Sequence, residues 1–582
     1  MCGIIGYVGD KNPVDVLING LKNLEYRGYD SAGIALKNEE EIQIIKSVGK
    51  ISDLEEKIKN TNIISSHMGI AHTRWATHGK PNEINAHPHK VGKITLVHNG
   101  IIENAEELKK MLQEKGIVFV SDTDTEVAAA LIHFYYQGNM KEAIEKASKV
   151  LKGSYAFGII CDDESDTLYA IRKESPLIIG VGENEHFITS DIGAILNETK
   201  KYVLLGKDEV VVLKRDEFHV YQGENEIHRE ILESSASEEE ISKHGYEHYM
   251  MKEMMEEPVL INQMIEKYQN HMESLPDIKK YKTIHIVGCG SAYYAGMIGK
   301  NFFEEEGIKV EVEIASEYRY RNVIYDENTL VILISQSGET ADTIAAMRKS
   351  NENHQDTLAI VNVESSTIAR ECTYQVLIEA NKEIAVATTK AYLLQVFVLS
   401  LLSMRGKQDE KYLEDLHQLP QQLKVLLDKT GYYKRIADQL CNQEHVFFIG
   451  RKNDYAMSLE GSLKLKEISY IHSEAYPAGE LKHGTISLIE EGTIVFAIVT
   501  DDTIQDKTIS NLEEVISRGA KPIYIGCNAS SYEEQFIVPK VHNRLQPILV
   551  VPALQMIAYF TAQKRGCNID QPKNLAKSVT VE

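Results

Sequence analysis

Apolar and polar positions along the chain predict an α+β domain for residues 1–235. Short apolar runs between turns are typical of strands, and they occupy residues 4–8, 94–98, 155–160 and 210–213. Amphipathic helices are expected among these strands. One of them carries a single apolar face made of Leu17, Ile18, Leu21 and Leu24, and Gly28 is expected to end it.

The second half of the chain follows a different pattern, in which strands alternate with helices. Such alternation predicts parallel sheets with crossover helices. The half also repeats itself, because the apolar run at 284–288 returns at 446–450 and the run at 330–334 returns at 494–498. Two doubly wound α/β domains in tandem are therefore predicted.

These patterns predict where the domains begin and end. The polar, charged segment 233–257 is expected to be a linker that runs into a helix. The expected division is a first domain at 1–235, a linker at 236–262, one α/β domain at 263–420, and a second at 421–582 that includes the C-terminal tail. The two copies differ after their second strand, so one is expected to bind ligand and the other to support it.

Charge and cysteine content narrow the classes of partner and location. The 63 Lys and Arg residues against 86 Asp and Glu residues give a net charge of −23, which repels phosphate backbones and anionic lipid. Nucleic acid and membranes are therefore poor partners, although a nest of backbone N–H groups can still bind a small anion. Seven cysteines without a CxxC pair, no apolar stretch of ~20 residues and no leader peptide favour a cytoplasmic location.

Cys2 is a candidate nucleophile because it directly follows the initiator methionine. Removal of Met1 would leave a thiol with a pKa of about 8.5 and an α-amine with a pKa of ~7.7–8.0 on one residue. The amine can then act as general base for its own thiol. The alternative is a buried core cysteine at the start of a strand.

Further polar groups of the first domain suit the recognition of an amino acid. The segment 72–79 (HTRWATHG) contains Arg74, whose planar guanidinium suits a carboxylate. Asn99 and Gly100 close a predicted strand and can offer two donors to an oxyanion. Asp124 lies at a predicted helix start, where it either caps the helix or holds a ligand's ammonium group.

Together with the segment 26–31 (YRGYDS), these motifs resemble the class II glutamine amidotransferase domain across residues 1–235. The resemblance implies an α+β N-terminal-nucleophile (Ntn) hydrolase fold, in which Cys2 attacks the side-chain amide of glutamine. Asn99 and Gly100 would form the oxyanion hole. The glutamine-binding residues that it implies are Arg74, Thr77, His78 and Asp124.

Metals and dinucleotides are not expected. Six histidines lie between His67 and His98, and the pair at His87 and His89 is an alternative metal site. No acidic or thiolate partner stands at ligand spacing, so a metal is not favoured. The turn at Gly290 does not complete a GxGxxG pattern, and we predict no NAD and no other cofactor.

In the second half, residues 335–340 (SQSGET) lie where an apolar strand turns into a helix. Backbone N–H groups and hydroxyls at such a position form an anion cradle, with a simple helix cap as the alternative. Lys464 and Glu467 share a helix face at i, i+3. They are either a surface ion pair, with Glu460 as a rival partner, or a carboxylate base beside a cation.

Two further residues suggest proton transfer and covalent chemistry. His483 stands on a Gly-flanked loop, where an imidazole suits proton transfer near neutral pH. Lys577 lies on an apolar-studded tail and is either solvated or a Schiff-base former.

These pieces, in this order over residues 250–582, resemble tandem sugar-isomerase (SIS) domains. The resemblance implies that Glu467 moves a proton between C1 and C2 of the sugar and that His483 assists ring opening. Lys577 would form an imine with the ketose, and Lys464 would lie beside the sugar. The substrate-binding residues implied are Ser291, Ser335, Gln336, Ser337, Thr340 and Thr388. Ala292, where a second hydroxyl is expected, casts doubt on one contact, whereas Thr388 keeps the hydroxyl of an expected serine.

The two resemblances together imply an aminotransferase. It would move the amide nitrogen of L-glutamine to D-fructose 6-phosphate and isomerise the product to glucosamine 6-phosphate, the first step of the hexosamine pathway. A homodimer is implied, with Trp75 gating an ammonia channel whose wall includes the tail near Ala576. The alternatives are a non-enzymatic sugar-phosphate sensor and an amidotransferase with another acceptor, such as phosphoribosyl pyrophosphate. For that acceptor the sequence lacks a strand that ends in paired acids.

Overall fold

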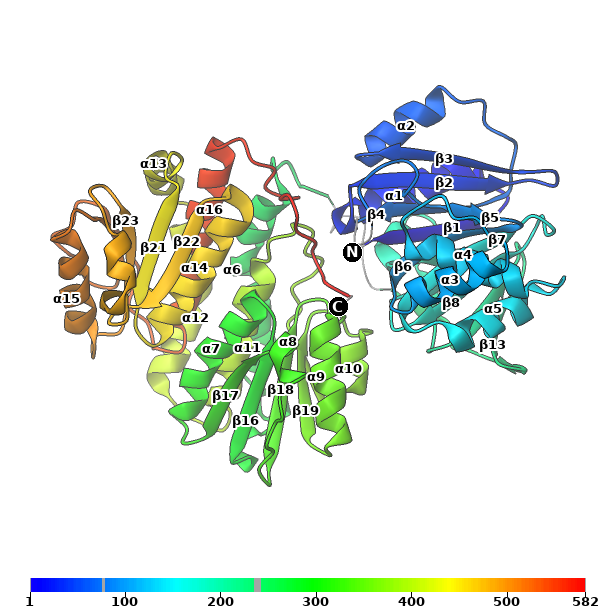
Figure 1. Cartoon of the computed structure of the whole chain (residues 1–582). Coiled ribbons are helices and arrows are strands. Elements are labelled where there is room, and N and C mark those ends of the chain that lie inside the picture. Colours follow the sequence, from blue (N-terminus) through cyan, green and yellow to red (C-terminus); the bar gives the residue numbers. More distant parts are fainter. Residues whose placement is uncertain (1, 76–78, 235–241, 581–582) are drawn as a thin grey trace. The chain divides into compact units, whose positions relative to one another are not determined.

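The computed structural model of the chain describes residues 2–75, 79–234 and 242–580, which Figure 1 traces. These residues form two compact units that divide between residues 242 and 243, and the segment from residue 578 onward belongs to the first unit.

The first unit contains two antiparallel sheets, of eight and seven strands among the described residues. The first sheet has the order β15-β11-β9-β10-β1-β4-β2-β3 and the second the order β14-β13-β12-β8-β7-β6-β5. The strands of the first sheet are β1 (Gly3–Gly9), β2 (Ser31–Lys37), β3 (Ile42–Val48), β4 (Met68–Arg74), β9 (Ile178–Val181), β10 (Glu185–Thr189), β11 (Lys201–Leu204) and β15 (Leu232–Glu233). Those of the second are β5 (His89–Val91), β6 (Ile94–Ile102), β7 (Gly153–Cys161), β8 (Leu168–Lys173), β12 (Glu209–Leu213), β13 (Phe218–Gln222) and β14 (Asn225–Ile227).

Helices cover the outer faces of both sheets, so the first unit is layered helix, sheet, sheet, helix. The helices are α1 (Pro13–Leu24), α2 (Ile51–Lys59), α3 (Ala105–Glu114), α4 (Asp124–Tyr135) and α5 (Met140–Val150). The alternation along β1 shows why, because Ile4 and Val8 enter the core between the sheets while Ile5 and Tyr7 pack with α1 and α2. The strands and the amphipathic helix expected from the sequence are present.

Gly28 is required for a reason other than helix termination. Helix α1 ends at Leu24, a 3₁₀ turn follows, and Gly28 is extended at φ −176°. A Cβ on Gly28 would lie 2.8 Å from the backbone of Arg74 and Trp75. The expectation that Gly28 ends the helix is therefore wrong, and the glycine instead lets two backbones approach beside Trp75.

The second unit contains two parallel sheets of five strands each within the described residues, as the alternating pattern predicts. Both have the same order relative to the chain, β17-β16-β18-β19-β20 and β22-β21-β23-β24-β25. The strands of the first are β16 (Thr283–Gly288), β17 (Lys309–Ile314), β18 (Thr329–Ser335), β19 (Asp356–Val361) and β20 (Tyr374–Leu377). Those of the second are β21 (His445–Gly450), β22 (His472–Pro477), β23 (Ile494–Val499), β24 (Lys521–Gly526) and β25 (Gln535–Ile537).

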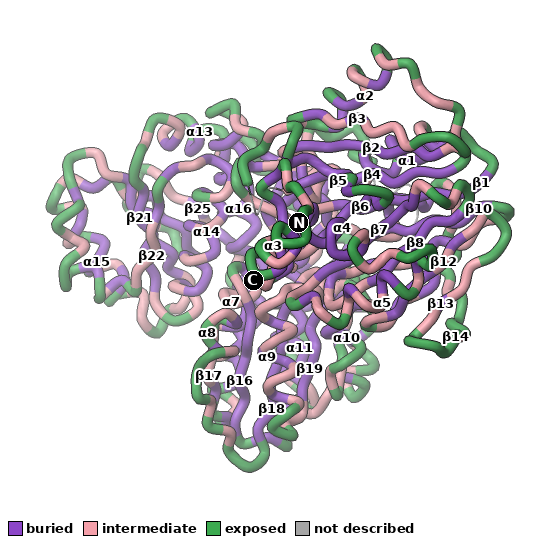
Figure 2. Tube along the Cα trace, turned by 45° about the vertical axis from the view of Figure 1, so that its right-hand side comes forward, coloured by how far each residue is buried: buried purple, intermediate pink, exposed green. Residues whose placement is uncertain are grey.

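Both faces of these sheets are buried, which explains their continuous apolar runs. Along β18, Leu330, Ile332 and Ile334 enter one core, and Val331 and Leu333 enter another. Figure 2 shows β16 and β21 as buried strands with exposed loops nearby. The covering helices are α6 (Tyr249–Tyr268), α7 (Ser291–Glu304), α8 (Ala315–Tyr318), α9 (Ala341–Glu352), α10 (Thr367–Glu371), α11 (Lys390–Met404), α12 (Glu410–Leu427), α13 (Thr430–Leu440), α14 (Asn453–Ser469), α15 (Gln505–Ile516) and α16 (Gln546–Lys564).

One hydrophobic core joins the two copies of the second unit. It collects one face of each sheet together with α6, α7, α11, α12, α13, α14 and α16. The expected linker 236–262 therefore includes the start of α6, which packs into this core, and the division expected at 420/421 lies inside α12. No described helix is long and apolar enough to span a membrane.

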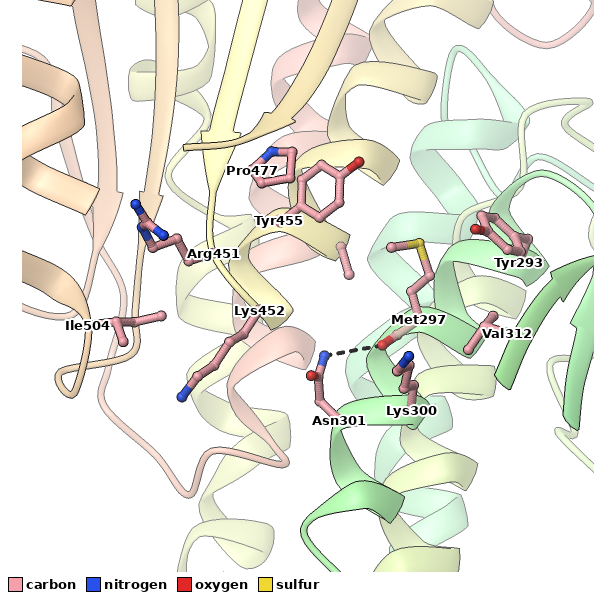
Figure 3. Close-up of a pocket in the computed structure, with 11 residues that line it drawn as sticks. Tyr293, Met297, Lys300, Asn301, Val312, Arg451, Lys452, Tyr455, Pro477 and Ile504 are labelled. Carbon is pink, nitrogen blue, oxygen red and sulfur yellow. Dashed lines mark hydrogen bonds between the residues drawn. The ribbon is translucent and has the colours of Figure 1, made fainter. Parts of the chain in front are cut away.

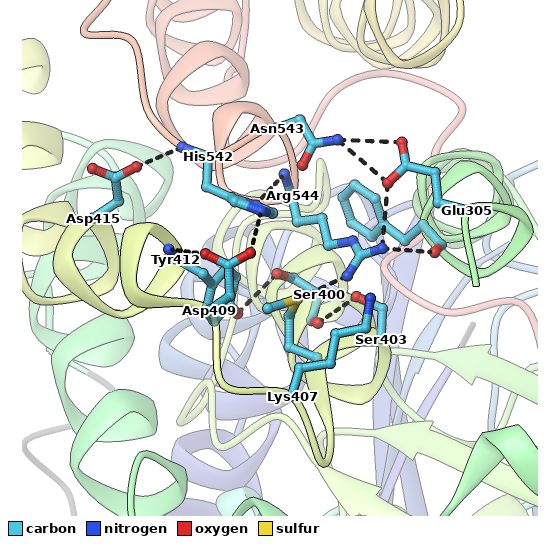
Figure 4. Close-up of polar contacts among 12 residues, drawn as sticks. Glu305, Ser400, Ser403, Lys407, Asp409, Tyr412, Asp415, His542, Asn543 and Arg544 are labelled. Carbon is cyan, nitrogen blue, oxygen red and sulfur yellow. Dashed lines mark hydrogen bonds and ion pairs between the residues drawn. The ribbon is translucent and has the colours of Figure 1, made fainter.

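A buried ion network also ties the copies together (Figure 4). The side chain of Arg544, before α16, is only 5% exposed and pairs with Glu305 at 3.3 Å and with Glu306 after α7. Asn543 donates to Glu305 at 3.2 Å, and the backbone N–H of His542 donates to Asp415 of α12 at 2.7 Å. This network fixes the end of α7 against the segment before α16, the last helix of the second copy, and that segment against α12.

Candidate active sites

Cys2 lies directly before β1 and is partly exposed. Its sulfur accepts a hydrogen bond from the backbone N–H of Trp75 at 3.2 Å, and the side-chain amide of Asn99 donates to the Cys2 carbonyl oxygen at 2.9 Å. Burial of the thiol raises its pKa, although the Trp75 N–H and the charge of Arg74 oppose that rise. A base close to the sulfur is therefore needed to form the thiolate.

The amide of Asn99, on β6, is oriented by a histidine. His72 Nε2 lies 3.1 Å from Asn99 Oδ1 and 2.9 Å from the His98 carbonyl oxygen. Burial lowers the pKa of His72 to about 3, so its ring is neutral. Since both neighbours are acceptors, Nε2 carries the proton, and Asn99 Nδ2 is left to point toward Cys2. The sequence analysis placed His72 in a motif but gave it no role.

Gly100 follows Asn99 in β6 with φ +132°, a backbone conformation that favours glycine. A Cβ at this position would lie 2.0 Å from the carbonyl oxygen of Ser154 on the paired strand β7. The residue type is thus dictated by the backbone beside the expected oxyanion site.

Arg74 lies near both Cys2 and Asp124, which are on different elements. Arg74 ends β4, and burial lowers its pKa even though Cys2, Asp30 and Asp124 act in the opposite direction. Asp124 begins α4 and accepts a hydrogen bond from the Ile102 N–H at 2.8 Å. The helix is capped by Thr123 instead, whose hydroxyl accepts from the N–H of Glu126 at 3.3 Å. The capping alternative for Asp124 is therefore wrong.

Trp75 contacts the ring of Tyr29 edge-on, with centroids 5.6 Å apart. Both its backbone N–H and its carbonyl oxygen contact the Cys2 sulfur, since the thiol also reaches the Trp75 carbonyl oxygen at 3.5 Å. Two other residues expected in this pocket, Thr77 and His78, lie outside the described residues.

Three histidines of the first unit, His72, His87 and His89, pack as a neutral cluster. His87 stacks on His72 with ring centroids 4.0 Å apart, and its Nε2 lies 3.1 Å from the hydroxyl of Thr125. His89 lies 3.1 Å from the hydroxyl of Thr123. Burial lowers the pKa of both His87 and His89. In the described ranges, no group of three His, Cys, Asp or Glu residues is placed to hold a metal ion.

In the second unit, the loop 335–340 joins β18 to α9 and is braced from within. The hydroxyl of Ser335 accepts from the Gly338 N–H at 3.1 Å and lies 3.0 Å from the Thr340 hydroxyl. The hydroxyl of Ser337 accepts from the Glu339 N–H at 3.2 Å. Thr340 occupies the cap position of α9 without a side-chain cap bond. A simple helix cap therefore does not explain these hydroxyls, and Gln336 belongs to the same loop.

Lys464 and Glu467, on α14, do not form a surface pair. The Lys464 side chain is 1% exposed, and its Nζ lies 2.5 Å from Glu467 and 3.5 Å from Glu460. Ser291, at the start of α7, donates to Glu460 at 3.1 Å and so links the two SIS-like copies. Burial raises the pKa of Glu460 to about 7, although Lys464 opposes this. The surface-pair alternative is wrong because α14 is covered by α7 and α16.

Lys577 folds back into the second unit, and its side chain is 5% exposed. Its ammonium pairs with Glu383 and donates to the Ala385 carbonyl oxygen at 2.8 Å. Thr388 also donates to Glu383, which in addition accepts from the N–H of Thr389 at 3.0 Å at the start of α11. The solvated alternative for Lys577 is therefore wrong.

Glu383 is the residue that sequence reasoning missed. Its burial opposes ionisation, but the Lys577 charge and the donors around it lower its pKa to about 2. It also contributes to raising the pKa of Lys464, which places it near both lysines. Its position six residues before Thr389, in a loop without a regular pattern, gave no periodic signal.

Helix α6 contributes buried acids to the same region. Glu253 accepts from the N–H groups of Ile384 and Ala385, and burial together with the charge of Glu383 raises its pKa to about 8. Glu257 is buried as well, and burial raises its pKa. At neutral pH the carboxylate charge is therefore concentrated on Glu383, opposite Lys577.

His483 is not brought to this cluster. His483 is exposed in a 3₁₀ turn after β22, and its backbone N–H donates to the backbone carbonyl oxygen of Glu480 at 2.9 Å. Among the described residues no hydrogen bond or ion pair joins its ring to Glu467 or Lys577. Ala292, beside Ser291, packs against the core that the two copies share.

Comparisons with known proteins agree with this division of the chain. A family model of the SIS domain matches residues 277–405 and 439–560, and a model of a glutamine amidotransferase domain matches residues 72–197. Glutamine–fructose-6-phosphate aminotransferase (isomerizing) of Clostridium tetani is 45% identical over the whole of both chains. The enzyme of the same name from Staphylococcus aureus is 42% identical, again over the whole of both. The chain belongs to the glutamine–fructose-6-phosphate aminotransferase family.

Solved structures cover the second unit of this family member. The C-terminal domain of glucosamine-fructose-6-phosphate aminotransferase from Francisella tularensis is 35% identical, with a TM-score of 0.53, over 57% of this chain and 100% of that chain. Tagatose-6-phosphate ketose/aldose isomerase from Escherichia coli is 15% identical with a TM-score of 0.50, over 55% and 95%. The latter likeness shows the fold alone.

Proposed function

We propose that this chain transfers the amide nitrogen of glutamine to fructose 6-phosphate and yields glutamate and glucosamine 6-phosphate. The observation that carries the proposal is the full-length match, at 42–45% identity, to curated enzymes whose name states this reaction. The two clusters of reactive groups, one around Cys2 and one around Lys577, supply the two chemistries that the reaction needs.

In the first unit, Cys2 is the nucleophile and its own α-amine, freed by removal of Met1, is the base. The thiolate attacks the side-chain carbonyl of glutamine, and the oxyanion is stabilised by Asn99 Nδ2 and the Gly100 N–H. Ammonia leaves with the proton that the amine took from the thiol, and water hydrolyses the thioester to glutamate. The helix–sheet–sheet–helix layering supports an Ntn-hydrolase fold.

Arg74 and Asp124 are proposed to hold the ends of glutamine. Their opposite charges and the proximity of Arg74 to both Cys2 and Asp124 support this assignment, since an amino acid presents one carboxylate and one ammonium. Thr77 and His78 complete the pocket on the strength of the resemblance.

In the second unit, the loop 335–340 holds the sugar phosphate through its N–H groups and hydroxyls. The Lys577 amine attacks the C2 carbonyl of the open-chain ketose and releases water to form an imine, which requires that its ion pair with Glu383 first opens. Ammonia then takes the place of Lys577 at C2. Glu467, held by Lys464, removes the proton from C1 and returns it to C2.

Ring opening needs an acid or base, and His483 is proposed to provide it in a second copy of the chain. Its exposure and its lack of a contact to Glu467 or Lys577 within the described chain support a role across a homodimer. The same proposal assigns Ser291 and Thr388 to the sugar site, through Glu460 and Glu383 respectively.

Ammonia must reach the sugar without entering bulk water, where it would become ammonium. We assign the gate of this passage to Trp75, whose backbone N–H and carbonyl oxygen both contact the Cys2 sulfur. The tail near Ala576, next to Lys577, would form part of the wall.

The test is a paired assay of glutamate and glucosamine 6-phosphate, with and without fructose 6-phosphate. The expected result is one glucosamine 6-phosphate for each glutamate and faster glutamate release when the sugar is present. A sugar-phosphate sensor would release no glutamate. Formation of glutamate with no amino sugar would overturn the proposed acceptor, and mass spectrometry that finds Met1 retained in the active enzyme would overturn the nucleophile.

A further inference from the structure

A cavity of about 470 Å³ opens at the carboxyl end of the second parallel sheet. Figure 3 shows residues of the second copy on one side of it and residues of α7 on the other. The second copy contributes Arg451, Lys452 and Tyr455, and α7 contributes Tyr293, Lys300 and Asn301. None of these residues belongs to the two sites described above.

The cavity occupies the place in the second copy that the expected sugar-phosphate site occupies in the first. Both sheets have their topological switch between the first and third strands in chain order, β16 and β18 in one and β21 and β23 in the other. Ligands of doubly wound sheets bind at the carboxyl ends of the strands at this switch. Arg451 and Lys452 follow β21, just as Cys289 and Gly290 follow β16.

The backbone of the second copy repeats the turn of the first. Gly290, before α7, has φ 55° and ψ −127°, and Lys452, before α14, has φ 49° and ψ −122°. This conformation favours glycine, yet the second copy holds a lysine there. In addition, the first residue of each of these two helices forms a hydrogen bond with the corresponding helix of the other copy. Ser291 of α7 bonds to α14 through Glu460, and Asn453 of α14 accepts from Asn301 of α7 at 2.7 Å.

The chemistry of the two places differs. The first is faced by Glu460, Lys464 and Glu467 of α14, whereas the second is faced by Met297, Lys300 and Asn301 of α7. The cavity in the second copy thus offers no carboxylate base for proton transfer. It is equipped to bind a ligand and not to isomerise it.

All the charged side chains in the lining are cationic: it includes Lys300, Arg451 and Lys452 and, among the described residues, no carboxylate. Lys452 pairs with Asp501 at 3.0 Å, and Lys300 pairs with Glu304 at 3.6 Å, where both side chains are exposed. The carboxylate of Asp454, two residues after Lys452, accepts hydrogen bonds from the backbone N–H and the hydroxyl of Thr500.

No acidic side chain pairs with Arg451 in the ranges that the structure describes. Its Nη2 donates to the neutral Asn511 at 2.7 Å, while its buried Nε has no hydrogen-bond partner in the described part of the chain. The positive charge of this guanidinium is therefore not offset by a carboxylate and can attract an anion.

We propose that this cavity is a second, non-catalytic binding site for a phosphorylated sugar. Arg451, Lys452 and the N–H groups that begin α14 would hold the phosphate, and Tyr293 and Tyr455 would border the sugar. The volume lies within the usual range of small-ligand pockets. The inference goes beyond the proposed function, because the nitrogen transfer does not use this site.

The experiment is equilibrium dialysis of the full-length chain with sorbitol 6-phosphate, which has no carbonyl and is not turned over. The wild-type chain is expected to bind two equivalents. Arg451→Gln combined with Lys452→Gly should abolish binding in the cavity and leave the equivalent bound at the loop 335–340. Ser337→Ala combined with Thr340→Val should abolish binding at that loop and leave the equivalent bound in the cavity. The control, Lys424→Gln combined with Arg435→Gln, removes two charges from exposed helices of the second copy and should keep both.

The proposal is overturned if the wild-type chain binds one equivalent, if the second equivalent survives the Arg451/Lys452 change, or if the control also loses it. If the Arg451/Lys452 double variant does not fold, the single variant Lys452→Gly tests the proposal instead, because glycine suits the backbone conformation of residue 452. It is expected to weaken the second equivalent about tenfold and to spare the first. Since binding is counted without glutamine or turnover, failure of the nitrogen transfer would be seen separately.

Discussion

The surroundings of Cys2 and of Lys577, the two proposed nucleophiles, hold these side chains in opposite ways. Cys2 is held by a backbone N–H and a side-chain amide that come from interior strands or their ends, next to histidines that burial keeps neutral. Lys577 is held by charge, opposite Glu383 in a region that also buries Lys464. A site built from sheet register can lose its reactive atom without loss of fold, whereas removal of one member of a buried charge cluster leaves the others uncompensated.

The sharpest test of this contrast is Cys2→Ala. Glutamine-dependent formation of glucosamine 6-phosphate should fall by at least about 10³-fold, because no other thiol occupies the site. Isomerisation of hexose phosphate by the second unit should remain detectable. Both activities are measured on the same preparation, with Cys441→Ala as control. Equal loss of both, in a folded chain, would contradict separable sites.

Lys577→Met should have the reciprocal effect. The amino-sugar product should fall by about 10³-fold because the imine cannot form, while glutamate release persists. Lys573→Met, on the same tail but exposed, is the matched control and should keep both activities. A Lys577 variant that still makes glucosamine 6-phosphate at near the wild-type rate would exclude the imine.

Arg544→Met tests how strongly buried charge supports the second unit. It leaves Glu305 and Glu306 without their buried partner and should lower the free energy of unfolding by about 3 kcal/mol in urea. Arg435→Met removes a pair with Glu534 in which the arginine is 55% exposed, and should cost under about 1 kcal/mol. Equal effects would show that burial does not distinguish the two pairs.

Glu460→Gln sharpens the comparison through pH. The folded chain raises the pKa of Glu460 from 4.5 to about 7, so it binds the proton more tightly than the unfolded chain does. This contribution to stability is complete below pH 4.5 and is lost as the pH rises to about 7. The glutamine of the variant does not titrate, so the variant does not lose this stability as the pH rises. The unfolding free energy of the variant minus that of the wild type should therefore increase by about 2 kcal/mol from pH 5 to pH 8.

Urea unfolding at the two pH values measures this difference, and Glu414→Gln, on the exposed face of α12, should show none. A gain for Glu460→Gln that is the same at both pH values would contradict a titration of Glu460 in this window.

Thr388→Val should have the smallest effect. It removes one hydroxyl that donates to Glu383 and should lower kcat/KM for fructose 6-phosphate about tenfold, with glutamate release unchanged. Thr388→Ser keeps the hydroxyl and should stay near the wild-type value. Indistinguishable kinetics for the two variants would show that the hydroxyl has no part in placing Glu383.

Much of the fold followed from local pattern. Burial on both faces of a parallel strand requires a continuous apolar run, so the strands of the second unit and their repetition could be predicted from the residues alone. The strand-to-helix loop at 335–340 could also be predicted locally, because the apolar run and the hydroxyl-rich segment after it stand next to each other in sequence.

What only the tertiary structure decided was which charges are buried together. Lys464 and Glu467 are compatible with a surface pair in sequence, and only α7 and α16, packed over α14, make the pair a buried one. Glu383 meets Lys577 across almost two hundred residues of chain. Period and spacing act over a few residues, whereas desolvation depends on every element that packs around a group, and no local pattern carries that information.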